Sequence, residues 1–282
     1  MHFFIHDSLH SGDVILTRPF IAALKEKYPD LTITLECHDY NVYLWEDFGF
    51  PVITYVGDHD HYTTKPTPNC PPDAFFINMW FEVFKDIAHK YHLTYKNNVH
   101  TFNRYMKLYN LRSIYQLSVP EVPPAVKFYR KPELPFAVNQ NSIFIENGHV
   151  RSGQSNFPMN DFVEHIAKAF PQYTYYCSAK PKGNASNLVD CSHLNLIQLS
   201  ELSNHCKALI THGSGVEAST YTEENRFKPR CMVGMGNYWI IWDNSQVFYA
   251  KDINGIIEFL GKLPDGKWFR MKQLLSKCSK CE

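Results

Sequence analysis

The sequence has no excess of either charge, because 28 acidic residues balance 28 basic ones over 282 residues. Such a chain lacks the broad positive field that draws a protein onto nucleic acid or an anionic membrane surface. We therefore expect no nucleic-acid partner. An anionic ligand would have to be held by a local site.

Long apolar runs are also missing. No stretch approaches the roughly 20 consecutive apolar residues of a membrane-spanning helix. The opening segment, 1–7, is short and soon interrupted by charge, unlike a secretory signal. These features predict a cytoplasmic protein without a membrane span.

Two nucleotide-binding fingerprints of fixed spacing are absent. The sequence contains neither G-x-G-x-x-G nor G-x-x-x-x-G-K-[ST]. The first absence disfavours a Rossmann-type dehydrogenase. Repeats of solenoid period and low-complexity tracts are absent as well.

The eight cysteines are scattered, and several lie inside apolar runs such as Tyr175-Tyr176-Cys177. We expect them to be reduced residues of the core, because a free thiol behaves there as a small hydrophobe. Cys278 and Cys281 have the spacing of metal ligands. A structural zinc site needs four ligands, and no matching pair stands nearby, so a C-terminal tail is the favoured interpretation.

Strand and helix patterns alternate in the first half of the chain. Apolar residues recur at helical spacing from Val14 to Leu24, and Pro29 stops that helix. A strand, a helix and a strand within about fifty residues form a βαβ unit, which implies a parallel sheet. The expected strands are 2–8, 31–35, 52–56 and 74–77, and aromatic-rich helices are expected at 81–91 and 98–110.

Five prolines between 118 and 140 mark a linker, after which the alternation restarts. Strands are expected at 142–145, 174–177, 208–211 and 230–233, and helices at 159–170, 200–206, 216–224, 252–260 and from about 267. The prediction is an α/β protein of two facing Rossmann-like domains with parallel sheets. An N-terminal domain takes 1–135, a C-terminal domain 141–266, and a C-terminal helix or tail 267–282.

The first candidate site is the loop Ser11-Gly12-Asp13, expected between the first strand and the first helix. Ligands of open parallel sheets bind beyond the carboxyl ends of the strands. Glycine lets the backbone approach a ligand closely, and a carboxylate at a helix start is favoured by the helix dipole. Asp13 could act there as a general base. Spacing alone favours the simpler role of an N-cap.

The second candidate is the strand-to-helix turn from Thr211 to Ser219, which contains His212, Gly213, Ser214 and Gly215. Small residues expose backbone N–H groups, and the following helix start adds partial positive charge, so the turn could bind a diphosphate without a metal. Glu217 could accept hydrogen bonds from ribose hydroxyls. The alternative is a tight turn with Glu217 on a solvated helix face.

Two further loops carry charged candidates. Arg151 follows the first strand of the second half, in a glycine-bearing loop, and could pair with phosphate or be merely solvated. Asp58 and Asp60 form a D-x-D that could hold a divalent ion and a sugar diphosphate, although exposed turns often show this pattern.

With these motifs the sequence resembles the family-9 glycosyltransferases of heptosyltransferase type, which have the GT-B fold. The family's G-D-(V/I)-(I/L)-(L/H)-T-x-P loop is matched from Gly12 to Pro19, and its aspartate, regarded as the catalytic base, corresponds to Asp13. Further similarity lies in 148–158, in Asp161-Phe162, in 199–202, in 206–210 and in Gly213-Ser214-Gly215.

The sequence departs from the family in its second half. Ser155 stands at the family's lysine and Phe157 at its tryptophan, while the D-T-G turn becomes Gly213-Ser214-Gly215 and Ala218 takes a histidine's place. The phosphate contacts must then come from other groups, for which Arg151, His212 and backbone amides are the candidates.

Together these features predict an inverting, metal-independent glycosyltransferase. It would move a sugar from a nucleotide-diphosphate donor to a hydroxyl of a glycan or glycolipid. Asp13 is the predicted base. By the resemblance, 1–135 is the acceptor domain and 141–266 the nucleotide-sugar domain. The predicted donor-binding residues are Gly12, Arg151, His212, Gly213, Ser214, Gly215 and Glu217. Asn78 and Trp80 are expected to contact the acceptor, although aromatic segments often belong to a core. A metal-dependent transferase using Asp58 and Asp60, and a non-catalytic nucleotide- or glycan-binding protein, remain the alternatives.

Overall fold

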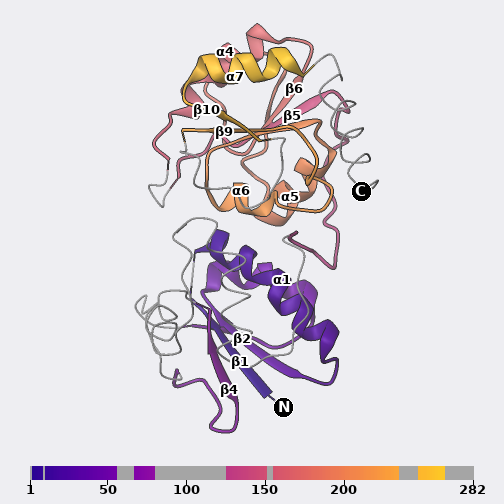
Figure 1. The fold of residues 1–282 in the computed structure, drawn as a ribbon, viewed down its shortest axis with the longest axis vertical. Helices are drawn as coiled ribbons and strands as arrows, with labels where there is room; N and C mark the ends of the chain where they lie inside the picture. Colours follow the sequence, from indigo (N-terminus) through magenta and orange to yellow (C-terminus); the bar gives the residue numbers. More distant parts are fainter. Residues whose placement is uncertain are drawn as a thin grey trace, which may run out of the picture.

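The computed structural model describes residues 2–8, 10–55, 67–79, 125–150, 155–234 and 247–263. Within them the chain forms two parallel sheets, one on each side of the segment 125–140, which itself contains neither helix nor strand. Figure 1 shows the two sheets with their helices as two halves. The expected α/β architecture is confirmed.

The first sheet has the strand order β3-β2-β1-β4. Its strands are rich in β-branched and aromatic residues, as the pleated, half-buried surface of a sheet favours. The bounds are β1 His2–Asp7, β2 Thr32–Cys37, β3 Val52–Thr54 and β4 Phe75–Asn78. Between β1 and β2 runs α1, Ser11–Lys27, and two short 3-10 helices, η1 Asp39–Leu44 and η2 Glu46–Phe48, follow β2.

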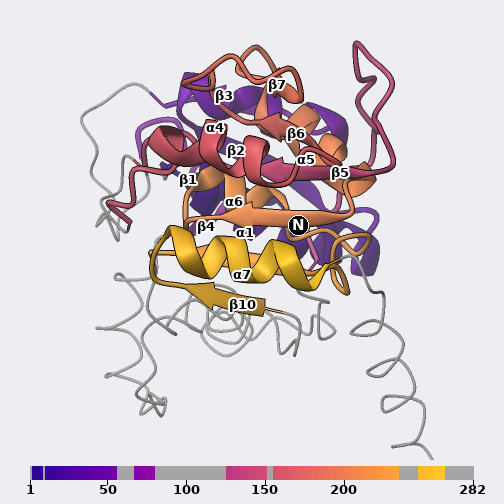
Figure 2. The ribbon, with the colours of Figure 1, turned by 90° about the horizontal axis from the view of Figure 1, so that it is seen from above.

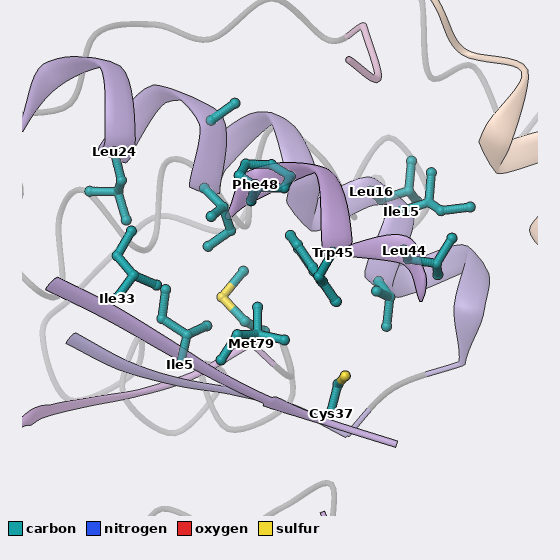
Figure 3. Close-up of a cluster of buried hydrophobic side chains, with 14 of the residues drawn as sticks. Ile5, Ile15, Leu16, Leu24, Ile33, Cys37, Leu44, Trp45, Phe48 and Met79 are labelled. Carbon is teal, nitrogen blue, oxygen red and sulfur yellow. The ribbon is translucent and has the colours of Figure 1, made fainter. Parts of the chain in front are cut away.

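The core of this half lies between the sheet and α1. Leu24 of α1 packs toward Ile5 and Ile33 of the sheet (Figure 3). Trp45 and Phe48, from η1–η2, are almost fully buried in the same cluster. The 3-10 segment after β2 therefore packs into the core.

The second sheet has the order β10-β9-β8-β5-β6-β7 and is covered on both faces. Ile143 and Ile145 of β5 pack under α4 and α7, whereas Phe144, between them, packs on α5. α4 and α7 share one face, and α5 and α6 lie toward α1 (Figure 1 and Figure 2). The strands are β5 Ser142–Ile145, β6 Thr174–Cys177, β7 Leu188–Asp190, β8 Ala208–Thr211, β9 Arg230–Val233 and β10 Val247–Ala250; the helices are α4 Met159–Ala169, α5 Leu196–His205, α6 Gly215–Ser219 and α7 Ile253–Lys262.

The two halves share apolar contacts where α1 meets α6. Ala218 and Tyr221, from the second half, belong to the buried cluster of the first. The N–H of Val126 donates to the carbonyl of Tyr221 at 2.6 Å, which attaches the connecting segment to the same place. The halves are therefore packed on each other along these helices.

Three expectations need correction, and three expected helices are not tested. Ser11, Gly12 and Asp13 form the first turn of α1 and are not a loop. α6 ends at Ser219 and does not run to 224. β7 and β10 were not expected. The helices expected at 81–91, at 98–110 and from 267 lie outside the described residues.

The cysteines in the described part of the chain are unpaired thiols. Cys37, Cys177, Cys191, Cys206 and Cys231 are buried, which confirms the expectation of core thiols for these five. Cys70 is a free thiol but only half-buried, and Cys278 and Cys281 are not described. No helix among the described residues is both long and apolar enough to cross a membrane.

Candidate functional site

Each sheet has one point where the direction of strand addition reverses. In the first sheet β2 and β3 lie on one side of β1 and β4 lies on the other; in the second, β6 and β7 lie on one side of β5 while β8 to β10 lie on the other. Ligands of open parallel sheets bind outside the carboxyl ends of the strands at such reversals. The two candidate regions are therefore the ends of β1 and β4 and the ends of β5 and β8.

At the end of β1 the chain enters α1 almost at once. The carbonyl of His10, the N-cap, accepts hydrogen bonds from the N–H groups of Asp13 at 2.9 Å and Val14 at 3.0 Å. Asp13 is therefore the third helical residue, and its N-cap interpretation is wrong. Its side chain is half-buried, and a carboxylate in the first turn is stabilised by the helix dipole.

The turn that carries Asp13 is fixed from two directions. The hydroxyl of Ser11 donates to Oδ1 of Asn41 in η1 at 2.7 Å. One turn further along α1, the hydroxyl of Thr17 donates to Oδ2 of Asp7, the last residue of β1, at 2.8 Å. The helix start is thus tied both to the strand before it and to the segment after β2.

Gly12 and Gly215 bring the two candidate regions together. A Cβ added to Gly12 would lie 2.9 Å from Cα of Gly215, a distance that real Cβ atoms essentially never show. The first turns of α1 and α6 therefore touch backbone to backbone. In this arrangement each glycine accommodates the other half of the chain.

The turn between β8 and α6 is held by a buried carboxyl group. Glu146, directly after β5, accepts hydrogen bonds from the backbone N–H of His212 at 2.9 Å and from the hydroxyl of Ser214. Ser214 is also the N-cap of α6, because its Oγ accepts from the N–H of Val216 at 3.0 Å. Gly213 has a φ of 83°, a left-handed conformation that favours glycine.

Glu217 lies inside the protein, so its placement on a solvated helix face is wrong. It is 3% exposed, accepts a hydrogen bond from the hydroxyl of Tyr221, and lies 4.0 Å from Nη1 of Arg230. Burial raises the pKa of Glu217 to about 7, with a further contribution from Glu146, and Arg230 and Tyr221 oppose the rise. A contact between Glu217 and a ribose stays a prediction.

His212 is a buried imidazole without a hydrogen bond. It is 1% exposed, and neither ring nitrogen has a hydrogen-bond partner. Burial lowers its pKa, although the backbone of Gly148 and the carboxyl group of Glu217 favour the protonated form. Leaving a buried polar group unsatisfied costs about 1–3 kcal/mol, so a ligand that hydrogen-bonds this ring would recover that cost.

The remaining predicted residues divide into two groups. Asn78, the last residue of β4, is buried beside the end of β1, in register with His6. Trp80, Arg151, Asp58 and Asp60 lie outside the described residues, so their roles stay predictions. In the described part of the chain, no group of three or more His, Cys, Asp or Glu side chains is placed to hold a metal ion.

The sequence suggested no role for Glu146, Tyr221 and Arg230, which surround Glu217. The guanidinium of Arg230 lies over the ring of Tyr221 at 4.5 Å and donates to Oγ1 of Thr220 at 2.8 Å. A glutamate directly after a buried strand was the one available signal for Glu146. Nothing in the local sequence marks Arg230, because its partners lie on α6 and after it.

The fold is shared with solved glycosyltransferases. Escherichia coli heptosyltransferase WaaC with ADP aligns with a TM-score of 0.61 at 11% identity, covering 93% of this chain and 97% of that one. E. coli ADP-heptose LPS heptosyltransferase II aligns with a TM-score of 0.57 at 13% identity, covering 93% of this chain and 98% of that one. A family-9 glycosyl transferase from Veillonella parvula aligns with a TM-score of 0.56 at 14% identity, covering 93% of this chain and 89% of that one.

At these identities the likeness establishes the GT-B fold, and the expected resemblance to family 9 is confirmed at that level. No protein-family model and no curated protein matches the sequence.

Proposed function

We propose that this protein is a glycosyltransferase that moves a sugar from a nucleotide-diphosphate donor to a hydroxyl group of a glycan or glycolipid. One observation carries the proposal: the helix turns at the two strand-order reversals meet at Gly12 and Gly215. A group bound at one turn would therefore lie beside a group bound at the other. Two substrates in direct contact are what a transfer reaction requires.

Asp13 is the proposed general base. Its carboxylate would take the proton of the acceptor hydroxyl while that oxygen attacks the anomeric carbon of the donor sugar. The bond between that carbon and the diphosphate oxygen breaks, and the configuration at the carbon inverts. The nucleoside diphosphate leaves with the electron pair. Asn78 and Trp80 are the proposed acceptor contacts.

The second half is the proposed donor side. The structures of WaaC hold ADP and an ADP-linked fluorinated heptose, which supports a nucleotide-diphosphate sugar as the donor class. The unsatisfied imidazole of His212 and the backbone of Gly213, Ser214 and Gly215 would bind the diphosphate, with Arg151 pairing to phosphate. The proposal is metal-independent, because these groups supply the stabilisation without a cation.

The experiment measures release of nucleoside diphosphate from ADP- and UDP-sugars by NMR, with water as the acceptor and with or without EDTA. Asp13→Asn keeps the size of the side chain and should lower release by about 10²–10⁴-fold. Glu26→Gln, an exposed position near the end of the same helix, is the matched control and should leave release unchanged. EDTA should have no effect.

Two results would overturn this account. Release that requires Mn²⁺ or Mg²⁺ would favour a metal site at Asp58 and Asp60. Nucleotide binding without any release, together with no effect of Asp13→Asn, would favour a non-catalytic binding protein.

A further inference from the structure

The carboxyl end of β2 carries an aromatic pair with no role in the proposed chemistry. His38 directly follows β2, and Tyr40 lies two residues later, in η1. The two rings are nearly parallel, with an interplanar angle of 11° and centroids 5.1 Å apart. We call them the His38–Tyr40 platform.

Tyr40 presents its ring to solvent. It is 46% exposed although His38 covers one face. Three other large apolar side chains in the described part of the chain are similarly exposed: Phe75 at the start of β4, Tyr129 in the connecting segment and Phe227 between α6 and β9. Of the four, Tyr40 is the one that follows the carboxyl end of a strand, where ligands of parallel sheets bind.

Hydrogen bonds and a ring contact hold the two residues of the platform in place. Nε2 of His38 hydrogen-bonds the carbonyl oxygen of Ser8 at 3.2 Å, and the ring of Tyr55 meets His38 edge-on at 5.8 Å. The N–H of Tyr40 donates to Oδ1 of Asp39 at 2.7 Å. A preorganised ring loses little conformational entropy when a ligand stacks on it.

A second observation at the same sheet edge points to a ligand. The hydroxyl of Ser8 is buried, at 2% exposure, and has no hydrogen-bond partner. Buried polar groups are nearly always satisfied, so each exception needs an explanation. The carbonyl of Ser8 is hydrogen-bonded to Nε2 of His38, so Ser8 lies against the edge of the platform's imidazole.

The platform is also coupled to the proposed base. Oδ1 of Asn41, the residue after Tyr40, accepts a hydrogen bond from the hydroxyl of Ser11, and Ser11 shares the first turn of α1 with Asp13. A ligand on the platform would therefore lie at the same edge of the sheet as Asp13. The platform belongs to the first half of the chain, and the β8–α6 turn belongs to the second. The contact between Gly12 and Gly215 lies where the two halves meet.

We propose that the His38–Tyr40 platform, with the Ser8 hydroxyl, is a subsite for a pyranose ring of the acceptor. A hexopyranose has an apolar face of C–H groups that stacks on an aromatic ring, and a rim of hydroxyls that pair with a buried polar group such as Ser8. The assignment to the acceptor, and not to some other saccharide, rests on the proposed function.

The test is saturation-transfer NMR with methyl β-D-glucopyranoside and methyl β-D-galactopyranoside as probes, titrated into the full chain without nucleotide. Wild-type protein should bind at least one of them. Tyr40→Ala should weaken that binding by about tenfold, and Tyr40→Leu, which keeps apolar bulk but removes the π face, should weaken it similarly. Phe227→Ala, at a still more exposed ring away from the platform, is the matched control and should bind like wild type.

No binding of either sugar to wild-type protein would overturn the subsite. Equal binding by Tyr40→Ala and wild type, with both folded by circular dichroism, would overturn it as well. A separate titration of wild type with nucleoside diphosphates distinguishes this failure from failure of the proposed function. Nucleotide binding without sugar binding contradicts only the platform, and sugar binding without nucleotide binding contradicts only the transferase.

Discussion

Gly12 and Gly215 lie backbone to backbone, and this contact joins the two halves of the chain at the proposed site. Gly12 has no space for a side chain, and a Cβ on Gly215 would make a tight contact of 3.2 Å with the backbone nitrogen of Gly12. The closeness of the two candidate regions therefore depends on both positions being glycine.

Gly12→Ala should lower the free energy of unfolding by about 1–3 kcal/mol, because the added methyl forces packed backbone apart. Gly261→Ala is the control: it lies in α7 with nothing within 4 Å of an added Cβ. That change should be neutral or stabilise by up to about 1 kcal/mol through helix propensity. Urea denaturation of both variants measures the difference. Equal effects would mean that the contact is loose.

Arg230→Met should destabilise the protein by about 3–5 kcal/mol, because it leaves the buried carboxyl group of Glu217 without its cation. Arg226→Met is the comparison, since Arg226 pairs with Glu223 at the surface and should cost no more than about 0.5 kcal/mol. Both are measured by denaturant unfolding at pH 8.5, above the pKa of about 7 of Glu217, where its carboxyl group is ionised in the wild-type protein. A small loss for Arg230→Met would show that Glu217 is already neutral at that pH.

The raised pKa of Glu217 predicts that the free energy of unfolding falls as pH rises. Its pKa is about 7 in the folded protein, so between about pH 4.5 and 7 the unfolded chain has released a proton that the native state retains. The stabilising contribution is complete below pH 4.5 and is lost by about pH 7, a change on the order of 3 kcal/mol. Glu217→Gln removes this dependence. Parallel pH profiles of the variant and wild type would contradict the assignment.

The lowered pKa of Glu36 predicts that the free energy of unfolding falls as pH falls. Burial alone would raise its pKa, but hydrogen bonds from His6, Asn69 and Thr67 outweigh burial and lower it. Its stabilisation is therefore present above the ordinary glutamate pKa and is lost as pH falls below it. Glu36→Gln should cost about 1.5–3 kcal/mol at pH 7 and less at pH 3.5. Unfolding curves at both values test this, and a constant loss would argue for packing alone.

The strands were predictable where the chain is β-branched or aromatic and buried, as in β5, β6, β8 and β9, whose predicted bounds match the structure. β7 was missed because Leu188–Asp190 is a short, half-exposed edge strand with little pattern. The turn Ser11-Gly12-Asp13 has loop-like composition, and its helical state depends on contacts with Asn41 and the second half of the chain.

α6 ends early for a local reason that composition does not reveal. The hydroxyls of Ser219 and Thr220 donate to the carbonyls of Val216 and Glu217, both at 2.7 Å, and so compete with continued helix. The candidate site was predictable at the level of which turns carry it. The burial of Glu217, and its network with Glu146 and Arg230, comes from tertiary packing of β5, α6 and β9, which no sequence window contains.

A thermal-shift titration of wild-type protein with ADP, UDP, GDP and TDP, each with and without EDTA, tests the central claim most directly. A ligand that binds only the folded state adds about 2.7 kcal/mol at 100 times its Kd. One of these nucleotides should raise Tm with increasing concentration, and should do so equally in EDTA. If none raises Tm, or if stabilisation vanishes with EDTA, the metal-free nucleotide site proposed at His212 and the β8–α6 turn is contradicted.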